Sequence, residues 1–372
     1  MTMNGSCRRC KLPITQTEGK IHLAMANVNV SIIGMNRLGT SFGLAIKALN
    51  GKPDHKHTFT VAGCDKNSEN VRKAARHGAL DAEHFNVIAA VQNADLVIMC
   101  VPYSETEATL EGIGGALKPG AVVLDSAPLK LPSIQWAERY LLRDSDGDQQ
   151  AYLVGITPIL NPTYLSLPEE APESGRADLF AEGVMIISPA PNCPPDAVQL
   201  ISDLSDLLGV KVHFTDPAEH DSIAAGMEGL PLLLQLALFK ALHSSPTWDD
   251  AQWFGNPSFV LATYRLIESN PEALGALLYR NRQNVIHRLD ALIEHLGKLR
   301  EVLQVDDDLL LGEMFQAAMG DYAEWQAARL RNKFSTEPDV SEAAAQARGS
   351  LSLFGAFVPN FRPRSKEKKA RK

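Results

Sequence analysis

The sequence predicts an α/β domain with a doubly wound parallel sheet, followed by an all-helical domain. Apolar strand-like runs alternate with helical stretches from residue 28 to about residue 215, which is the pattern of repeated βαβ units. Beyond that point the strand-like runs stop and long apolar helical patterns follow. A chain of 372 residues is also too long for one ordinary hydrophobic core, so two domains are expected.

Short apolar runs in the first part of the chain are the predicted strands. They cover residues 28–34, 57–65, 94–102, 121–127, 151–158, 183–189 and 210–216. The run at 94–102 is apolar along most of its length, as a strand buried on both faces should be. Such a strand belongs in the middle of a sheet that helices cover on both sides.

Helical patterns separate most of these strands and then dominate the rest of the chain. They cover 40–50, 68–79, 104–117, 133–142 and 195–209 in the first part, and 217–242, 270–303 and 306–334 in the second. Gly78 near the end of the second pattern is an ordinary helix stop. The stretch 164–180 is polar and contains proline, which predicts a mobile loop beside an active cleft.

Composition argues against several classes of function. The net charge of −8 disfavours a general nucleic-acid-binding protein, and no apolar run reaches the roughly 18 residues that span a bilayer, so neither nucleic acid nor membrane is an expected partner. Five cysteines make no disulfide framework in this chain, and Cys64 and Cys100 lie in apolar strands, which favours a reducing cytoplasm. Cys7 and Cys10 form half of a zinc motif without a second pair, so two exposed thiols and no metal site are expected.

The stretch "SIIGMNRLGTSFG" (residues 31–43) predicts a strand, a glycine loop and a helix, the phosphate-binding arrangement of Rossmann-like domains. Gly34 supplies the tight turn and Gly39 the close packing of helix on strand, while Asn36 replaces the middle glycine. Asparagine tolerates left-handed backbone angles better than most residues. The N–H groups at the start of the helix are suited to phosphate.

Asp65 ends the second strand and predicts a contact with the ribose hydroxyls of a dinucleotide. It comes later than the roughly 20 residues after the loop that are typical, and the extra loop at 50–56 accounts for the difference. A carboxylate repels a 2′-phosphate, so NAD is expected, while Arg37 and Lys66 keep NADP as an alternative. Further cofactor contacts are expected at Leu38, Val101 and Pro102. The competing interpretation is a Rossmann-like domain that no longer binds nucleotide, because Asn36 breaks the pattern.

These features divide the chain into four parts. They are a disordered N-terminal tail at 1–26, a Rossmann dinucleotide-binding domain at 27–214, a helical domain at 215–335 and a partly disordered C-terminal tail at 336–372. The helices of the third part carry more apolar positions than one small bundle buries. A homodimer built on this part is the simplest way to cover them.

Several stretches resemble, in order and spacing, the prephenate/arogenate dehydrogenases of tyrosine synthesis. They are "IIGMNRLGTSFGLAIKA", "GCDKNSENVRKAARHGALD", "ADLVIMCVP", "LKPGAVVLDSAPLK", "DPAEHDSIAAGMEGLPLLL" and "TYRLIESNPEAL" with the later "NRQNV". The resemblance implies a Rossmann domain and a helical dimerisation domain, with active sites in the clefts between domains. It also implies hydride transfer from the ring of a small carboxylate, prephenate or arogenate, to a nicotinamide, with loss of carbon dioxide as the ring becomes aromatic.

The chain departs from the family's pattern at the motifs that carry the chemistry. Thr157 in "GITPILNP" stands where the family has its catalytic histidine, the acceptor for the ring hydroxyl. Pro128 in "APLK" replaces a serine, while Lys130 remains. Glu228 and Gly229 replace a serine and a histidine on the first long helix.

Other positions match the family. Arg265 matches its carboxylate-binding arginine, a task that suits a planar guanidinium, and a solvated helix-face arginine is the alternative. His220 and Asp221 also match, and ordinary capping at a helix start is the favoured interpretation of both. The candidate catalytic residues are therefore Thr157, Glu228, Arg265 and Lys130. Glu228 would serve as the base only if burial raised its pKa.

The resemblance thus implies a divergent NAD(P)-dependent oxidoreductase of tyrosine biosynthesis. The alternatives are a related dehydrogenase for another small carboxylic acid and a catalytically weak cofactor-binding paralogue. A threonine has no useful basicity near neutral pH, and general acid–base catalysis contributes about 10²–10⁴-fold. Turnover well below the enzyme median of about 10 per second is therefore expected.

Overall fold

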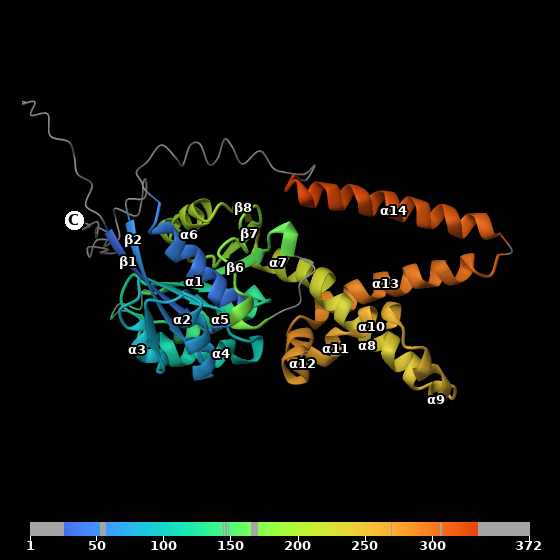
Figure 1. The fold of residues 1–372 in the computed structure, drawn as a ribbon, viewed down its shortest axis with the longest axis horizontal. Helices are drawn as coiled ribbons and strands as arrows, with labels where there is room; N and C mark the ends of the chain where they lie inside the picture. Colours follow the sequence, from blue (N-terminus) through green and yellow to red (C-terminus); the bar gives the residue numbers. More distant parts are fainter. Residues whose placement is uncertain are drawn as a thin grey trace, which may run out of the picture.

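The computed structural model describes residues 26–333, apart from 53–56, 144, 146, 148, 165–169, 269 and 306. This part of the chain has two regions, an α/β domain built on an eight-stranded sheet and a helical region that extends away from it (Figure 1). Apart from Ala26, which begins the first strand, the predicted tails, with Cys7 and Cys10, lie outside the described residues.

The sheet holds all the predicted strands and one short strand besides. Its members are β1 Ala26–Ile33, β2 His57–Cys64, β3 Ala82–His84, β4 Leu96–Met99, β5 Val122–Asp125, β6 Tyr152–Ile159, β7 Val184–Pro189 and β8 Lys211–Phe214. They lie side by side in the order β3-β2-β1-β4-β5-β6-β7-β8. The additional strand, β3, spans only 3 residues, too few to show a sequence period.

The direction of β7 corrects the prediction of a wholly parallel sheet. β7 pairs antiparallel with β6, with Thr157 opposite Ile186, and β8 pairs parallel with β7. Parallel neighbours need a long crossover, usually a helix. Between β6 and β7 the described residues hold only the 3-10 turns η1 Pro162–Tyr164 and η2 Pro172–Ser174, so the chain turns back beside β6.

Helices cover both faces of the sheet, as a doubly wound arrangement requires. They are α1 Arg37–Leu49, α2 Ser68–Arg76, α3 Val87–Val91, α4 Tyr103–Gly114, α5 Lys130–Tyr140 and α6 Pro195–Leu207. In β4, Leu96 and Ile98 belong to the core shared with α1, α2 and α6, whereas Val97 and Met99 belong to the core shared with α3, α4 and α5. The alternation follows from the two-residue period of a strand.

The second region is helical, as predicted, but more divided. Its elements are α7 Pro217–Ala224, η3 Ala225–Gly229, α8 Leu230–His243, α9 Trp248–Ala251, η4 Gln252–Phe254, α10 Pro257–Thr263, α11 Arg265–Glu268, α12 Pro271–Arg280, α13 Arg282–Val302 and α14 Asp308–Leu330. The single helix predicted over 270–303 breaks at Asn281, whose φ of −106° and ψ of 17° are not helical. Asn281 instead donates a side-chain hydrogen bond to the Asp221 carbonyl at 2.7 Å.

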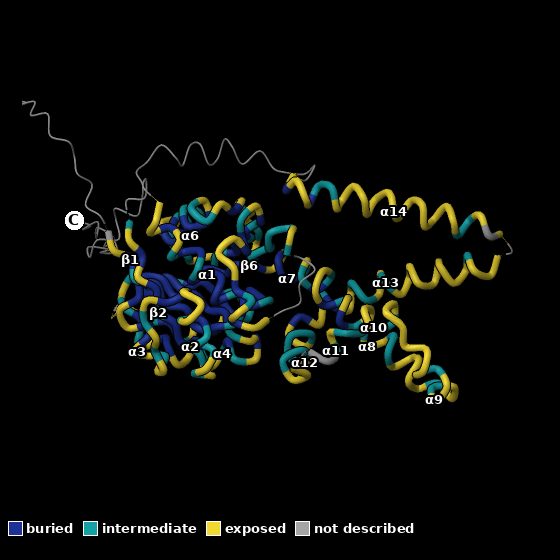
Figure 2. The backbone as a smooth tube through the Cα atoms, viewed as in Figure 1, coloured by how far each residue is buried: buried dark blue, intermediate teal, exposed yellow. Residues whose placement is uncertain are grey.

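α13 and α14 form a long hairpin whose surface is mostly exposed (Figures 1 and 2). Its exposed large apolar side chains include Ile286, Ile293, Leu296, Leu299, Leu309, Met314, Phe315, Met319, Tyr322, Trp325 and Leu330. The end of α14 returns to the α/β domain. There Arg329 donates to the Leu160 carbonyl, and Asn332 Nδ2 donates to the carbonyls of Glu182 and Gly183 at 3.0 and 2.9 Å.

One continuous helix, Pro217–His243, is long and apolar enough to cross a membrane by length and composition. The most apolar 18-residue window of this helix has a mean hydropathy of 1.5, and 17% of that window is buried. The sequence contains no uninterrupted apolar run of that length. This helix includes polar residues, and it meets the criterion only because the mean hydropathy of its most apolar window is high.

Candidate active site

The glycine loop joins β1 to α1 at the carboxyl edge of the sheet, and close backbone contacts fix two of its glycines. Gly34 has a φ of 93°, and a Cβ atom there would lie 2.4 Å from the Cys100 carbonyl oxygen. A Cβ atom on Gly39 would lie 2.0 Å from the Gly34 carbonyl oxygen. Both positions therefore require glycine, and the loop lies directly against the end of β4.

Asn36 fills the middle position of the loop by capping α1. Its Oδ1 accepts from the Gly39 N–H at 3.0 Å, and its Nδ2 donates to the Cys100 carbonyl at 3.0 Å. Its φ is −83°, so the tolerance of asparagine for left-handed angles is not the reason for its presence. The reason is its side chain, which satisfies a helix N–H and ties the loop to β4.

Asp65 lies at the end of β2 and faces the loop. Its Oδ2 accepts from the Met35 N–H and its Oδ1 from the Asn67 N–H, each at 2.7 Å. Lys66 is largely exposed, with its Nζ 3.5 Å from Glu105 Oε1. The other predicted cofactor residues border the same edge: Arg37 and Leu38 begin α1, and Val101 and Pro102 join β4 to α4.

The described part of the segment between β6 and β7 lies across α1. The Arg37 N–H, in the first turn of α1, donates to the Glu170 carbonyl at 2.9 Å. The Arg176 N–H donates to Ser41 Oγ at 2.9 Å. A carbonyl of the chain therefore takes one of the helix N–H groups that would otherwise face a phosphate. The predicted loop at 164–180 thus lies beside the cofactor loop, although 165–169 fall outside the described residues.

Lys130 is fully buried at the start of α5. Its Nζ donates to the Ala127 carbonyl at 2.5 Å and to the Ile156 carbonyl at 2.6 Å. Burial lowers the pKa of Lys130 to about 8, against the attraction of Asp125, and burial also raises the pKa of Asp125. The amine ties the β5–α5 turn to β6 immediately before Thr157, which gives it a positioning role.

Thr157 begins a chain of hydrogen bonds that leads into the protein. Its Oγ1 lies 2.8 Å from His220 Nε2, and His220 Nδ1 lies 3.0 Å from Asp221 Oδ1. His220 and Asp221 are 6% and 3% exposed. The Asp221 carboxylate also accepts the backbone N–H groups of Lys130 at 2.7 Å and Leu131 at 3.0 Å, so it caps α5.

This chain of hydrogen bonds fixes the roles of the imidazole nitrogens. An ionised carboxylate only accepts, so Nδ1 of His220 carries the proton that it donates to Asp221. In the neutral imidazole Nε2 is then an acceptor, and the Thr157 hydroxyl donates to it. The hydroxyl oxygen keeps its own acceptor capacity for another group.

The sequence favours a capping role for His220 and Asp221 at a helix start, but the structure assigns the cap of α7 to another residue. Asp216 caps α7, accepting the Ala218 N–H at 2.8 Å, and Pro217 takes the first helical position. An aspartate followed by proline is itself a complete helix start. That signal leaves His220 and Asp221, both buried, without a capping role in α7.

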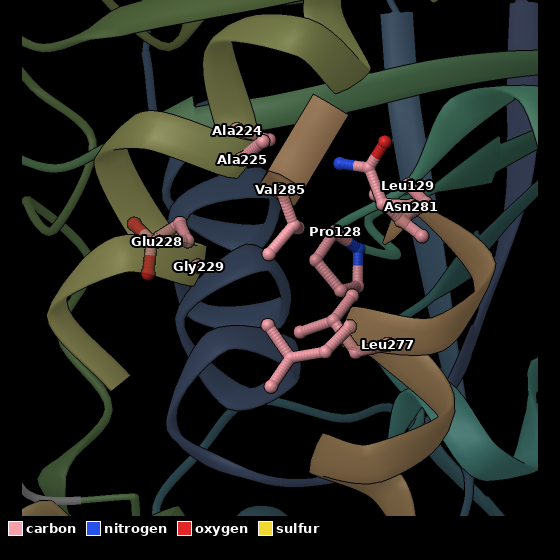
Figure 3. A pocket seen from close by; sticks show the side chains of 10 residues that line it. Pro128, Leu129, Ala224, Ala225, Glu228, Gly229, Leu277, Asn281 and Val285 are labelled. Carbon is pink, nitrogen blue, oxygen red and sulfur yellow. The ribbon is translucent and has the colours of Figure 1, made fainter. Parts of the chain in front are cut away.

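A small pocket lies between the α/β domain and the helical region (Figure 3). Its empty volume is about 250 Å³, part of it open to solvent. It is lined by Pro128, Leu129, Ala224, Ala225, Glu228, Gly229, Leu277, Leu278, Asn281 and Val285. Pro128, Leu277 and Val285 face one another across it, while the Glu228 carboxylate turns away from them (Figure 3). Glu228 and Gly229 come from the π-helical turn η3, a kind of turn that is frequent at functional sites.

Arg265 pairs with Glu228, one of the residues that line this pocket. Arg265 Nη1 lies 3.9 Å from Glu228 Oε2, and the two side chains are 47% and 59% exposed. The burial that Glu228 would need to act as the base is therefore absent in the described chain. The opposite wall includes Asn281, which is bonded to Asp221, so the pocket adjoins the Thr157–His220–Asp221 chain.

The part of the chain that the structure describes contains no group of 3 or more His, Cys, Asp or Glu residues that could hold a metal ion. Within it, Cys64, Cys100 and Cys193 are free thiols. Cys100 and Cys64 are buried, as their apolar strands predicted.

Comparison with known proteins agrees with this architecture. Residues 51–214 match the family model of the prephenate dehydrogenase nucleotide-binding domain, and residues 216–317 match that of the prephenate dehydrogenase dimerization domain. The cyclohexadienyl dehydrogenase of Zymomonas mobilis is 27% identical over 315 residues, which are 84% of this chain and 98% of the relative. The prephenate dehydrogenase of Bacillus subtilis is 23% identical over 333 residues, 88% of this chain and 84% of the relative.

Solved structures share the fold. A prephenate dehydrogenase from A. aeolicus, in complex with hydroxyphenyl propionate and NAD+, has a TM-score of 0.66 at 21% identity and covers 80% of this chain and 98% of its own. The arogenate dehydrogenase of Synechocystis has a TM-score of 0.61 at 20% identity, with coverage of 80% and 100%. The predicted α/β domain with a following helical domain is confirmed, and the chain belongs to the prephenate dehydrogenase family.

Proposed function

We propose that this chain is an NAD-dependent oxidoreductase that converts prephenate or arogenate by oxidative decarboxylation. The observation that carries the proposal is the hydrogen bond between the Thr157 hydroxyl and a buried histidine. Thr157 belongs to the part of β6 that continues beyond the end of its neighbour β5. Gly155 pairs with Asp125 at the end of β5, so Thr157 lies at the same carboxyl edge as the glycine loop. Ligands of open α/β sheets bind beyond this edge. Family membership and the activities named for the relatives support the same reaction.

The glycine loop fits a dinucleotide. Gly34 and Gly39 keep the turn free of side chains, and the Asp65 carboxylate is an acceptor for ribose hydroxyls at the end of the next strand. A carboxylate there favours NAD over NADP, and the A. aeolicus structure contains NAD+. When bound, the oxidised nicotinamide accepts a hydride. The hydrogen bond between the Arg37 N–H and the Glu170 carbonyl must open if a phosphate is to take that N–H.

The pocket beside Arg265 is the proposed substrate site. A guanidinium binds a carboxylate through two parallel N–H groups, so the substrate carboxylate would compete with Glu228 for Arg265. Thr157 would face the ring hydroxyl, and Lys130 would hold the backbone before Thr157 in place. We propose that the enzyme works as a cytoplasmic homodimer, assembled through the region that matches the dimerization domain.

A second candidate is oxidation of another small carboxylic acid. It is favoured by the apolar wall of the pocket, where Pro128 and Gly229 provide no side-chain polar group. A non-catalytic, cofactor-binding paralogue is the remaining alternative.

The test is to mix the purified protein with NAD or NADP and with prephenate, arogenate or a panel of small carboxylic acids, and to follow the absorbance of the reduced nicotinamide. Turnover of prephenate or arogenate supports the proposal, and turnover of another acid supports the second candidate. Arg265→Ala should abolish carboxylate binding and turnover. Arg139→Ala is the matched control, because Arg139 also pairs with a glutamate, Glu107, at 3.7 Å, and neither residue lines the pocket.

A further inference from the structure

We propose that His220 is the terminal proton acceptor of the reaction and that the Thr157 hydroxyl relays the proton to it. The inference rests on the proposed function. It replaces the expectation, drawn from the sequence, that a chain with threonine in this position has lost its acceptor. In this proposal Thr157 is the residue that touches the substrate, His220 acts through it as the base, and Asp221 is a positioning residue that holds His220.

The geometry suits a relay. Thr157 Oγ1 and His220 Nε2 are 2.8 Å apart, a normal hydrogen-bond distance, and the acceptor nitrogen is the one that Asp221 leaves unprotonated. The Thr157 side chain is half-buried at the sheet edge, whereas His220 is 6% exposed. A substrate hydroxyl therefore reaches Thr157 first, and the base behind it is shielded from water.

The step balances in protons and electrons. The substrate is a cyclohexadienol with a ring carboxylate, and the oxidant is NAD. The C–H bond beside the hydroxyl breaks, its electron pair leaves with the hydride, and the nicotinamide is reduced while that carbon is oxidised. The hydroxyl proton moves to Thr157 Oγ1 as the proton of Thr157 moves to His220 Nε2.

Decarboxylation then returns the proton. The bond between the ring and its carboxylate breaks, carbon dioxide leaves, and the electron pair makes the ring aromatic. The ring oxygen recovers one proton along the reverse path, so His220 ends neutral. Asp221 stabilises the imidazolium between the two stages and is itself held by the N–H groups of α5.

Other charged groups lie around the Thr157–His220–Asp221 hydrogen bonds, and none of them is altered in the variants compared below. Lys130 and Asp125 are buried next to these hydrogen bonds. The negative charge of Asp221 acts to raise the pKa of both Lys130 and Tyr103. Glu219 and Asp216 lie on the same helix as His220 and are exposed.

The experiment compares Thr157→Ser, Thr157→Val and His220→Gln in the full chain, with Thr109→Val as control. Thr109 is also half-buried with its hydroxyl bonded to a carbonyl, at 2.7 Å, on α4. Thr157→Val and His220→Gln should each lower kcat about 10²–10⁴-fold with KM little changed. Thr157→Ser keeps the hydroxyl and should retain most of the kcat of the unaltered protein. The double variant should be no slower than either single one, because both break the same relay.

A second readout does not depend on turnover. Nitrogen NMR of the histidine rings should show His220 protonated at Nδ1 and bare at Nε2, with the Nε2 signal shifted by Thr157→Val and not by Thr109→Val. Normal kcat in Thr157→Val, multiplicative losses in the double variant, or an unshifted Nε2 signal would overturn the relay. Absence of turnover by the unaltered protein on prephenate and arogenate would overturn the proposed function, and the relay with it.

Discussion

The Asp65 carboxylate holds the glycine loop in place and is also the proposed ribose contact, so a substitution of Asp65 affects both loop stability and cofactor binding. Removing the side chain loses the contact proposed for the ribose and also the hydrogen bonds from Met35 and Asn67. Asp65→Asn keeps the shape and an acceptor oxygen but removes the charge that repels a 2′-phosphate. Loop stability and cofactor choice can therefore be separated by this pair of variants.

We predict that Asp65→Ala weakens NAD more than NADP, because the carboxylate is the group that distinguishes the two riboses. Asp65→Asn should lose the preference for NAD with a smaller fall in melting temperature. Calorimetric titration with both cofactors checks this. Equal losses for NAD and NADP would show that Asp65 does not contact the ribose.

We predict that Lys130 makes the free energy of unfolding of the protein increase with pH in the alkaline range. Burial lowers its pKa from 10.5 to about 8, so between these values the unfolded chain binds more protons than the folded one. The contribution of Lys130 to the free energy of unfolding should therefore rise with pH across this window, by on the order of 3 kcal/mol. Urea unfolding of the parent and of Lys130→Met from pH 7 to 10.5 measures it. Parallel curves for the two proteins would contradict the prediction.

At the scale of elements, the β1–α1 turn is a closely constrained contact in the nucleotide-binding domain. A Cβ atom on Gly39 would overlap the Gly34 carbonyl, whereas one on Gly112 in α4 would meet nothing within 4 Å. We predict that Gly39→Ala destabilises the fold by several kcal/mol or prevents folding, while Gly112→Ala stabilises it by about 0.5–1 kcal/mol. Chemical denaturation of the two variants measures the change in the free energy of unfolding. An equal change in both would refute the close packing at Gly39.

Elements and residues differ in how far the sequence predicts them. The strands, the glycine loop and Asp65 follow from local patterns of two to a few residues, and they lie where those patterns place them. The reversal of β7 was not predicted, because strand direction depends on whether a crossover covers the sheet rather than on the strand itself. The bond between Thr157 and His220 joins residues 63 positions apart, so no spacing rule reveals it. Arg265 and Glu228 were both candidates, but their pairing is a tertiary contact.

At the scale of the molecule, the exposed apolar side chains of α13 and α14 need a cover, and the match to a dimerization domain suggests a second copy. We predict a dimer by light scattering at micromolar concentration. Phe315→Asp with Met319→Asp, at side chains 61% and 69% exposed, should yield monomers. Ile88→Asp, at a side chain 49% exposed on the α/β domain, should leave the dimer intact. A parent protein of monomer mass would contradict the prediction.

The return of α14 to the sheet has a consequence for how the chain folds. The hydrogen bond from Arg329 to the Leu160 carbonyl joins residues 169 positions apart, and Asn332 reaches back 150 positions to Glu182. During synthesis the strands and their helices emerge first, and these bonds form only after the whole hairpin has left the ribosome. Contacts of such long range close slowly, since the entropy of a large loop must be lost before they form. From the topology we therefore expect the sheet to assemble early and α14 to close the helical region onto it last.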